Sequence, residues 1–526
     1  MMPAYDDKIY MRAAWIWVVC FAIFRFVYSS AFLLAPDEAN YWQWSRHLAL
    51  GYHDQAPLLA WAIKLGTLLL GHTEEGVRLP SVAGMLIASL YLVAIAGRWI
   101  NGQTAFYTAV LSQGIPEFNI GGLLATPDGL QAAAWAGATY HAGRAYENNK
   151  WNQWLKCGFF FGFGMLSKYT MVLFLPCAFF YGLFSSLHRD RLARIRPYVG
   201  VVLGAVMFLP VIVWNASNNW NSVRHVAYIG GANDSFSLHY NYIGDFFASQ
   251  AALVSPIVFI LAMAAWHLSV TRRRDEKNWA LSFLFFTSFP MFAFFLLLSL
   301  HTRVYGNWPG ASYLGVCVLV AAFFSGDSKK ILPRKKPRVW RRLWPWGISL
   351  GYLFSGLILL HAVWPVLPIP GSLDRAATEI SGWRMVGETA GQMAKTMPDP
   401  EKTFIFGLSY QMASELAFYV PGQPDTVSIN KWKRPNVYDY WNNDESLIGR
   451  DAVGVTTEPD SHIKKLGQVF QRVDPPAALD VFRKPVFYPR KSDNHPVETY
   501  YFYRAYGFKG GIHWVPPDPS DIRASD

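Results

Sequence analysis

The stretch LLAPDEANYWQW, Leu33–Trp44, places two adjacent acids directly after an apolar segment. That segment, Ala13–Leu34, has the length and composition of a membrane-spanning helix, which needs about 20 mostly apolar residues. It is too long for a cleaved signal peptide, and no small-residue cleavage site follows it. Asp37 and Glu38 therefore mark the point at which the chain leaves an apolar phase, and they raise the question of what two carboxylates do there.

The composition of the whole chain repeats this apolar character. Of 526 residues, 52% are hydrophobic and 16% are charged, whereas soluble domains carry about 25% charged residues. We therefore expect a polytopic α-helical membrane protein with about eleven spans by the length criterion. The spans after the first are Ser81–Ile100, Thr104–Ile115, Gly129–Tyr146, Trp154–Ser167, Tyr169–Leu187, Tyr198–Trp214, Phe246–Val270, Trp279–Leu300, Pro309–Phe324 and Gly347–Pro365.

The formal charge of +11 is explained by topology. Basic residues cluster in alternate loops, and by the positive-inside rule these loops are cytoplasmic. Nucleic acid is therefore excluded as a partner, and an odd number of spans places the N-terminus inside and the C-terminal tail outside. The clusters are Arg144–Lys156, Arg189–Arg196, Arg272–Lys277 and Lys329–Arg342.

Two domains are expected. Residues 1–367 form a transmembrane catalytic domain whose large first outer loop is 35–80. Residues 368–526 alternate helix-like and strand-like patterns, as in "DRAATEISGW", "KTFIFGL" and "YYFYRAYGF", and this alternation indicates a periplasmic α/β domain. The four cysteines all lie in apolar segments, so no disulfide framework is expected.

Acids recur on the predicted outer face. Adjacent helical residues point about 100° apart, so Asp37 and Glu38 cannot share one site: one would face a cavity and the other would cap or pair. Asp54 precedes a proline-led helix, and Asp128 begins the fourth span. Helix capping explains each acid alone, but three of them on one face favour a site.

Cations supply the other half of this hypothetical site. Lys168 lies between two spans with almost no loop, and Arg303 follows the ninth span. Snorkelling to lipid headgroups explains one such residue, whereas several opposite acids suggest an anionic group such as phosphate. We add the following substrate-binding candidates on the same outer face: Tyr41, Gln55, Arg78, Arg224, His301 and Asn307. Arg25, in the middle of the first span, is expected to pair inside the bundle.

Several classes of site are not indicated by the sequence. It contains no phosphate loop, no Walker lysine, no nucleotide fingerprint and no His/Cys zinc spacing. We therefore expect no soluble nucleotide-sugar donor and no metal site from spacing alone, although a divalent cation bridging acids and phosphate is compatible with the pattern.

The chain resembles the GT-C superfamily of integral-membrane glycosyltransferases. Within it, the chain is similar to the branch with the lipid A aminoarabinose and galacturonic acid transferases, which is related to the protein O-mannosyltransferases. The resemblance covers nearly the whole chain. It rests on "APDEANYWQWSRHLALGYHDQAPLLAW", "LLATPDGLQ", "GFGMLSKYT", "LPVIVWNASNNW", "GNWPGASYL" and, in the tail, "SGWRMVG" and "SYQMASELAFYVPGQP…RPNVYDYW".

The resemblance implies a polyprenyl-phosphate sugar donor and a glycolipid acceptor, lipid A or lipopolysaccharide core, at the outer face of a bacterial inner membrane. It assigns the catalytic acid to Asp37, and Lys168 matches a recurrent family lysine. Where the aminoarabinose enzymes carry a lysine, this chain reads Asp54-Gln55-Ala56-Pro57, which favours a different sugar or acceptor.

An inverting single displacement is then expected. Lys168 and Arg303 would neutralise the leaving phosphate, and Asp37, with Asp128 as second catalytic acid, would orient or deprotonate the acceptor. A protein O-glycosyltransferase, a lipid-linked sugar flippase and an outward-facing binding or assembly protein are the alternatives. A flippase would usually show an internal repeat or broken helices in matching halves, and the sequence shows neither.

Overall fold

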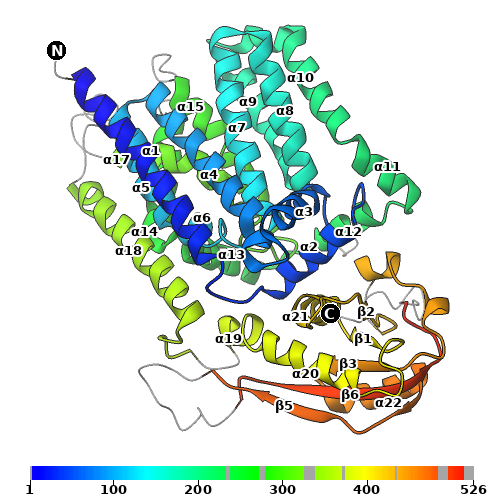
Figure 1. The fold of residues 1–526 in the computed structure, drawn as a ribbon. Coiled ribbons are helices and arrows are strands. Elements are labelled where there is room, and N and C mark those ends of the chain that lie inside the picture. The colour runs from blue at the N-terminus through cyan, green and yellow to red at the C-terminus, as the bar shows by residue number, and fades with distance from the viewer. Residues whose placement is uncertain are drawn as a thin grey trace. The chain divides into compact units, whose positions relative to one another are not determined.

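A computed structural model describes residues 3–232, 237–271, 279–324, 338–369, 373–432, 435–483 and 496–513 (Figure 1). The chain divides into two compact units. The first contains Met1–Ser29 and Ala49–Gly356, and the second contains Ser30–Leu48 and Leu357–Asp526. The acidic stretch that opens the first outer loop thus belongs to the second unit. The predicted basic clusters Arg272–Lys277 and most of Lys329–Arg342 lie outside the described residues.

The first unit is entirely helical in its described residues. Its longer elements are α1 (Pro3–Tyr28), α3 (Leu58–Leu70), α4 (Glu74–Trp99), α5 (Gly102–Gly114), α7 (Pro127–Asn148), α8 (Trp151–Ser167), α9 (Phe174–Phe184), α10 (Ile195–Met207), α11 (Leu209–Ser217), α13 (Tyr240–Val254), α14 (Pro256–Thr271), α15 (Trp279–Phe286), α16 (Phe289–Leu298), α17 (Ser312–Phe324) and α18 (Arg338–Val363). Short helices lie in the connections: α6 (Pro116–Asn119), η1 (Tyr169–Leu173), η2 (Arg189–Ala193) and α12 (Asn221–Ile229).

Four described helical segments are long and apolar enough to cross a membrane, and six are if each of two bent pairs is one span. The predicted span Phe246–Val270 is not one straight helix. It is broken at Ser255, with positive φ, where α13 and α14 meet at 105°. Pro256 follows directly and cannot continue a helical hydrogen-bond ladder. The predicted span Trp279–Leu300 corresponds to a single candidate span, Trp279–Leu298, which contains α15 and α16.

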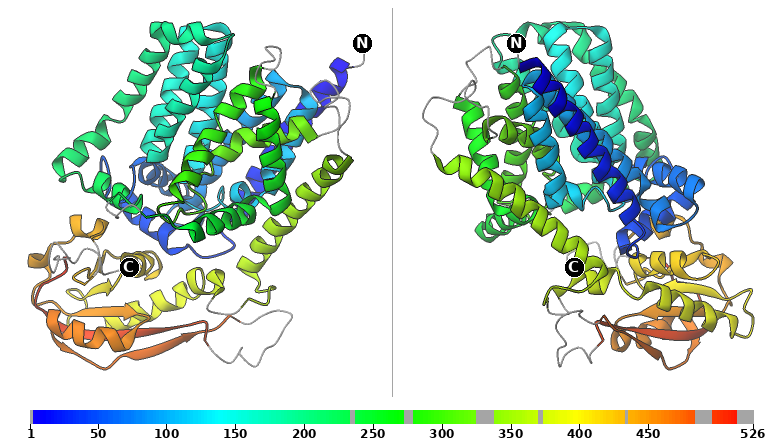
Figure 2. Two further views of the ribbon diagram at one scale, coloured as in Figure 1. Left: turned by 180° about the vertical axis from the view of Figure 1, so that it is seen from behind. Right: turned by 60° about the vertical axis from the view of Figure 1, so that its left-hand side comes forward.

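The packing of the first unit is that of a polytopic bundle. Its core is a single cluster of alanine, leucine and aromatic side chains, with α4, α7, α8 and α10 in close contact. Both views in Figure 2 show α8 and α10 side by side. Arg25 is buried and donates to the carbonyls of Phe118 and Asn119 at 3.2 Å, which is the structural pairing expected for it.

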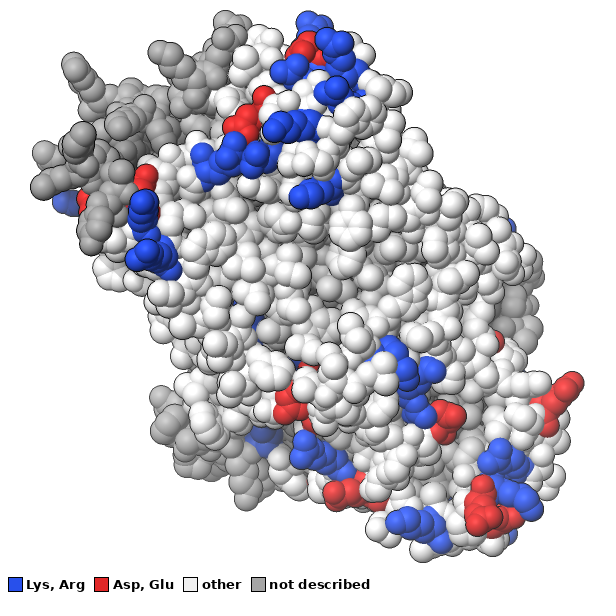
Figure 3. All heavy atoms as spheres, turned by 45° about the horizontal axis from the view of Figure 1, so that its top comes forward, with Lys and Arg blue, Asp and Glu red and all other residues white. Residues whose placement is uncertain are grey.

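Exposed lysine and arginine side chains gather at one end of the first unit, where α7 meets α8 and α9 meets α10 (Figure 3). Arg144, Lys150, Lys156 and Arg189–Arg196 supply this cluster. The opposite ends of α7 and α8 carry Asp128 and Lys168 of the predicted site. The charges therefore separate along the bundle, as the positive-inside pattern predicts.

The second unit is a mixed sheet with helices. Its strands are β1 (Phe404–Gly407), β2 (Thr426–Ser428), β3 (Ala452–Thr456), β4 (Phe470–Val473), β5 (Ala477–Val481) and β6 (Glu498–Phe508). Their order is β2-β1-β3-β6-β4, and β5 also pairs with β6. β1 is parallel to β2 and β3, whereas β6 is antiparallel to its neighbours.

The helices of the second unit pack on this sheet. They are α2 (Pro36–Arg46), α19 (Arg375–Glu379), α20 (Trp383–Lys395), α21 (Tyr410–Tyr419), α22 (Pro459–Val469) and the short helices η6 (Val437–Tyr440) and η7 (Asp444–Ser446). α21 contacts β1 and β2 on one side and α2 on the other. The expected C-terminal α/β domain is therefore present, and α2 is part of the same compact unit.

Candidate functional site

The centre of the candidate site in the first unit is an ion pair between Asp128 and Lys168. The Lys168 ammonium donates to Asp128 Oδ1 at 2.6 Å, and the Asn307 amide donates to Oδ2 at 3.0 Å. Lys168 is 8% exposed and Asp128 22% exposed, so the pair is shielded but reachable. The sequence placed these residues in three different loops, and the fold brings them into contact.

Local structure explains how the two charged groups are held. Pro127 begins α7, a position where its missing N–H costs nothing, and its carbonyl accepts a bond from Ser167 Oγ at 2.8 Å. α7 also approaches α4 closely. A Cβ on Gly84 would lie 2.5 Å from the carbonyl oxygen of Gly129, so only glycine allows this approach. Asp128 therefore stands on a rigid helix start, and Lys168 follows directly after the end of α8.

Glu117, on α6, adds a second carboxyl group beside this pair. Together with Asp128 and Gly310 it lines a small cavity of about 20 Å³, which is room for a single water molecule. A Cβ on Gly310 would lie 2.2 Å from Glu117 Oε1. Burial raises the pKa of Glu117 to about 8, Asp128 adds to the rise, and Lys168 opposes it. Burial thus favours the protonated form of the Glu117 carboxyl beside the Lys168–Asp128 pair.

A second polar group lies in the loops before α3 and at α12. His225 Nε2 lies 3.1 Å from Asp54 Oδ1, and the His53 ring lies next to that of His225, tilted by 44° with centroids 4.9 Å apart. One ligand atom from each of these three residues lies within 4.8 Å of the other two. Two imidazoles and a carboxylate are a donor set that suits Zn²⁺, so this group can hold a metal ion.

The Lys168–Asp128 pair and the group of His53, Asp54 and His225 are linked through Tyr169. Tyr169 follows Lys168, and its hydroxyl lies 2.8 Å from Ser222 Oγ on α12, the helix that carries His225. A displacement of α12 would therefore be transmitted to the segment that carries Lys168.

The acids of the opening stretch lie in the second unit. Glu38 is buried, and its Oε2 accepts the backbone N–H of Ala35 at 2.9 Å, which caps α2. Asp37 is exposed on the same turn. Glu38 thus has the capping role expected for one acid of the pair, and a cavity in front of Asp37 stays a prediction. Tyr41, one turn later, packs edge-on against Trp44.

The remaining predicted residues have different surroundings. Arg78 is fully buried and donates to the carbonyl of Ser29 at 2.5 Å, so it ties α4 to the end of α1. His301 contacts the carbonyl of Gly231, and Arg224 is exposed on α12. Gln55 accepts the N–H of Tyr52 with its backbone carbonyl.

Arg303 is 78% exposed, 4.0 Å from Asp245, and its contact is with that acid, not with Asp128.

Glu117, His53 and His225 were not among the sequence candidates. Glu117 had a recognisable signal, because Pro116-Glu117 repeats the proline–acid pair seen at Pro36-Asp37 and Pro127-Asp128. The histidines had none, because they come from loops far apart in the chain. Their grouping depends on the fold.

Known proteins resemble this chain in its fold and in part of its sequence. Residues 54–214 match the family described as dolichyl-phosphate-mannose-protein mannosyltransferase. The crystal structure of ArnT from Cupriavidus metallidurans bound to undecaprenyl phosphate superposes with a TM-score of 0.63 at 15% identity, over 93% of this chain and 97% of that one. The chain has the fold of ArnT. The apo state of the same protein gives a TM-score of 0.60 at 16% identity with the same coverage.

A curated relative adds a sequence match. The lipid A galacturonosyltransferase RgtD of Rhizobium johnstonii is 25% identical over 334 residues, which is 62% of this chain and 64% of the relative. The match thus spans just under two thirds of that protein's length. The predicted resemblance to the GT-C glycosyltransferases is confirmed by these matches together.

Proposed function

We propose that this protein is an inverting glycosyltransferase that takes a sugar from a polyprenyl-phosphate donor and transfers it to an envelope glycolipid. The ArnT fold, with one ArnT structure holding undecaprenyl phosphate, and the match to a lipid A galacturonosyltransferase support the reaction class. The observation that carries the proposal is the shielded Lys168–Asp128 pair at the end of the bundle opposite the basic cluster.

Lys168 would bind the donor phosphate. An ammonium has three N–H donors, and the bond to Asp128 uses one of them, which leaves two for phosphate oxygens. Asn307 and the protonated Glu117 are further donors near the same point. Because these groups are held before the reaction, they stabilise the charge that develops as the sugar–phosphate bond lengthens, without reorganisation.

The acceptor oxygen would attack C1 of the sugar as the C1–O bond to phosphate breaks and its electron pair passes to the phosphate. One such displacement inverts the anomeric centre. Asp37 is our choice for the group that orients the acceptor or takes its proton, and Asp128 orients Lys168 against the leaving group. If the acceptor is itself a phosphate, already ionised, Asp37 has only to position it.

The acceptor is proposed to be lipid A or lipopolysaccharide core, in the periplasmic leaflet of a bacterial inner membrane, with the C-terminal domain in the periplasm. The match to the mannosyltransferase family supports a second candidate, transfer to a protein hydroxyl. A flippase would move the donor without forming a new glycosidic bond, so product analysis separates it from both.

A divalent ion, where the reaction uses one, would be held by His53, Asp54 and His225, whose donor atoms fit it. Its charge would neutralise Asp54 and fix α12 next to the segment that carries Lys168. We expect exposure to a chelator to reduce activity, and Zn²⁺ to restore it in the wild type but not in His225→Ala. Activity unchanged in the metal-free wild type would remove the ion from the reaction.

The deciding experiment is product analysis by mass spectrometry. Membranes with the wild type, Asp128→Asn or Asp37→Asn are supplied with polyprenyl-phosphate sugars and lipid A. We expect a sugar adduct on lipid A with the wild type and a loss of at least about a hundredfold with each variant, the magnitude seen when a positioned catalytic group is removed. Adducts on protein alone would move the acceptor to the second candidate, and transfer unaffected by both variants would refute the assigned chemistry.

A further inference from the structure

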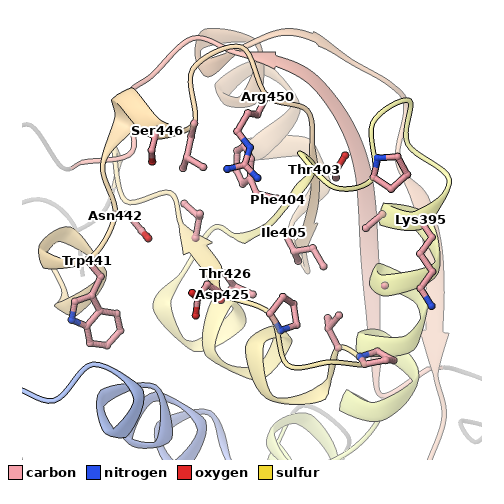
Figure 4. Close-up of a pocket in the computed structure, with 18 of the residues that line it drawn as sticks. Lys395, Thr403, Phe404, Ile405, Asp425, Thr426, Trp441, Asn442, Ser446 and Arg450 are labelled. Atoms are coloured by element: carbon pink, nitrogen blue, oxygen red, sulfur yellow. The ribbon is translucent and has the colours of Figure 1, made fainter.

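A polar cavity lies in the second unit, apart from the acids and lysine discussed above. It measures about 490 Å³, within the range of small-molecule binding sites. Its floor is the start of β1 and β2, one wall is the last turn of α20, and the other is the segment from η6 to Arg450 (Figure 4). All the lining residues belong to the second unit.

The cavity is positively charged. Figure 4 shows the Arg450 side chain pointing into it, towards Phe404, while Lys395 stands at the rim. Asp425 is the one acid among the lining residues, and Arg46 already neutralises it with a 2.6 Å ion pair. The balance therefore favours an anionic ligand.

Arg450 is prepared to bind such a ligand. Its Nε donates to the carbonyl of Lys402 at 2.6 Å, which fixes the direction of the guanidinium. Its two terminal nitrogens make no hydrogen bond or ion pair within the described parts of the chain. This planar fork matches a carboxylate or a phosphate with two parallel hydrogen bonds.

Two further features indicate that the anion is carried by a sugar. Asn442 lines the cavity, and its side chain is a polar amide to which a ligand hydroxyl can bond. Trp441 adds an aromatic wall, held by His47, whose ring stacks on it at 4.4 Å. Polar donors beside one aromatic surface suit a pyranose, and a simple anion would leave most of this volume empty.

We propose that this cavity is a second carbohydrate site, which binds an acidic saccharide bearing a carboxylate or phosphate. Arg450 binds the acidic group, Asn442 a hydroxyl, and Trp441 the ring. This binding does not depend on whether the protein transfers a sugar. The further step, that the saccharide is part of the acceptor, rests on the proposed function, and it gives the C-terminal domain the task of recognising the acceptor's charged sugars.

The test uses the purified full-length protein in nanodiscs and saturation-transfer NMR with four probes: glucuronate, glucose 6-phosphate, glucose and inorganic phosphate. We expect both acidic sugars to bind, and glucose to bind about tenfold or more weakly, since a charge-assisted pair is absent. If one of the two acidic sugars binds more tightly, its carboxylate or phosphate is the group that Arg450 prefers. Phosphate binding equal to that of glucose 6-phosphate, or glucose equal to glucuronate, would overturn the proposal.

Variants locate the binding in the cavity. Arg450→Gln and Asn442→Ala should each weaken acidic-sugar binding, by about tenfold for the arginine, and Arg450→Lys should recover part of it. Arg375→Gln is the matched control, because Arg375 is an exposed arginine on α19 of the same unit, paired with Glu379. Equal binding by Arg450→Gln and the control would refute the site, and thermal melts of all variants verify that they are folded.

Measurements of sugar transfer distinguish the saccharide-site proposal from the proposed glycosyltransferase function. Asp128→Asn should bind glucuronate as the wild type does, even when it transfers no sugar. Arg450→Gln should raise KM for a lipid acceptor and leave kcat and donor binding unchanged. Saccharide binding in a protein that forms no glycosidic bond would refute the proposed function alone. An unchanged KM for the acceptor in Arg450→Gln would refute the acceptor-recognition role.

Discussion

Two ion pairs of the first unit show what burial does to the same chemical groups. Lys168 and Asp128 lie 2.6 Å apart and are mostly shielded from solvent, whereas Arg303 and Asp245 lie 4.0 Å apart with 78% and 59% exposure. In the sequence, Lys168 and Arg303 are equivalent candidates for a phosphate-binding cation. Coulomb attraction grows as the effective dielectric constant falls, so the shielded pair is the one that can fix a charged group in place.

The largest effect is expected from Lys168→Gln. The change leaves Asp128 without its cation and removes the leading donor to the phosphate, so transfer should fall by about a hundredfold to a thousandfold. Loss of one partner of a shielded pair also destabilises the fold, by about 3 kcal/mol at most here because Asp128 is partly solvated. Single-turnover transfer and thermal unfolding measure the two effects separately. Lys168→Arg, which retains the charge, should keep the stability; activity retained in Lys168→Gln would contradict the role of the pair.

The next effect concerns Glu117 and pH. Its pKa is raised to about 8, so the folded protein binds a proton that the unfolded chain loses near pH 4.5. The free energy of unfolding should therefore decrease as pH rises from about 4.5 to about 8. Above pH 8 the new charge beside Asp128 would also repel the donor phosphate. In Glu117→Gln the pH dependence of the unfolding free energy and that of donor binding should both disappear. A pH profile of kcat/KM identical to that of the wild type would contradict the role given to Glu117.

A smaller effect is expected from Tyr169→Phe, which removes the hydroxyl contact to Ser222 at 2.8 Å. The ring and its packing stay, and one neutral hydrogen bond contributes about 1 kcal/mol. We expect donor KM to rise about fivefold while kcat stays near the wild-type value, since Lys168 is loosened but present. A fall in kcat with unchanged KM would show that Tyr169 acts in the chemical step.

The smallest effect is expected from Arg303→Gln. Exposed pairs contribute about 0–1 kcal/mol and are screened by salt. The rate of transfer should therefore change by less than about twofold. The Tm should change by about 2 °C. If Arg303→Gln reduced transfer as strongly as Lys168→Gln, the comparison that opens this section would be wrong, and both cations would have to act on the phosphate.

Sequence reasoning found Asp128, Lys168 and Asn307 separately, because each is a polar residue next to an apolar helix. It could not pair them, since the contact depends on how α7, α8 and the loop before α17 pack. The meeting of Asp37 with Lys168 stays a prediction, since Asp37 belongs to the second unit and Lys168 to the first. The break between α13 and α14 was also missed. Pro256 is a local signal for it, but apolar length, the criterion for a span, does not reveal a bend.

The sequence by itself determined the class of the protein, because apolar length and the alternation of basic loops are additive properties that need no partner residues. It also determined that Asp37 and Glu38 point in different directions, because adjacent helical residues lie about 100° apart. Only the tertiary structure decided which charges are shielded and which atoms face one another: Lys168 with Asp128, Glu117 beside them, His53 with His225, and Arg450, whose terminal nitrogens have no partner among the described residues. Burial and direction are properties of packing between distant segments, and no local pattern encodes them.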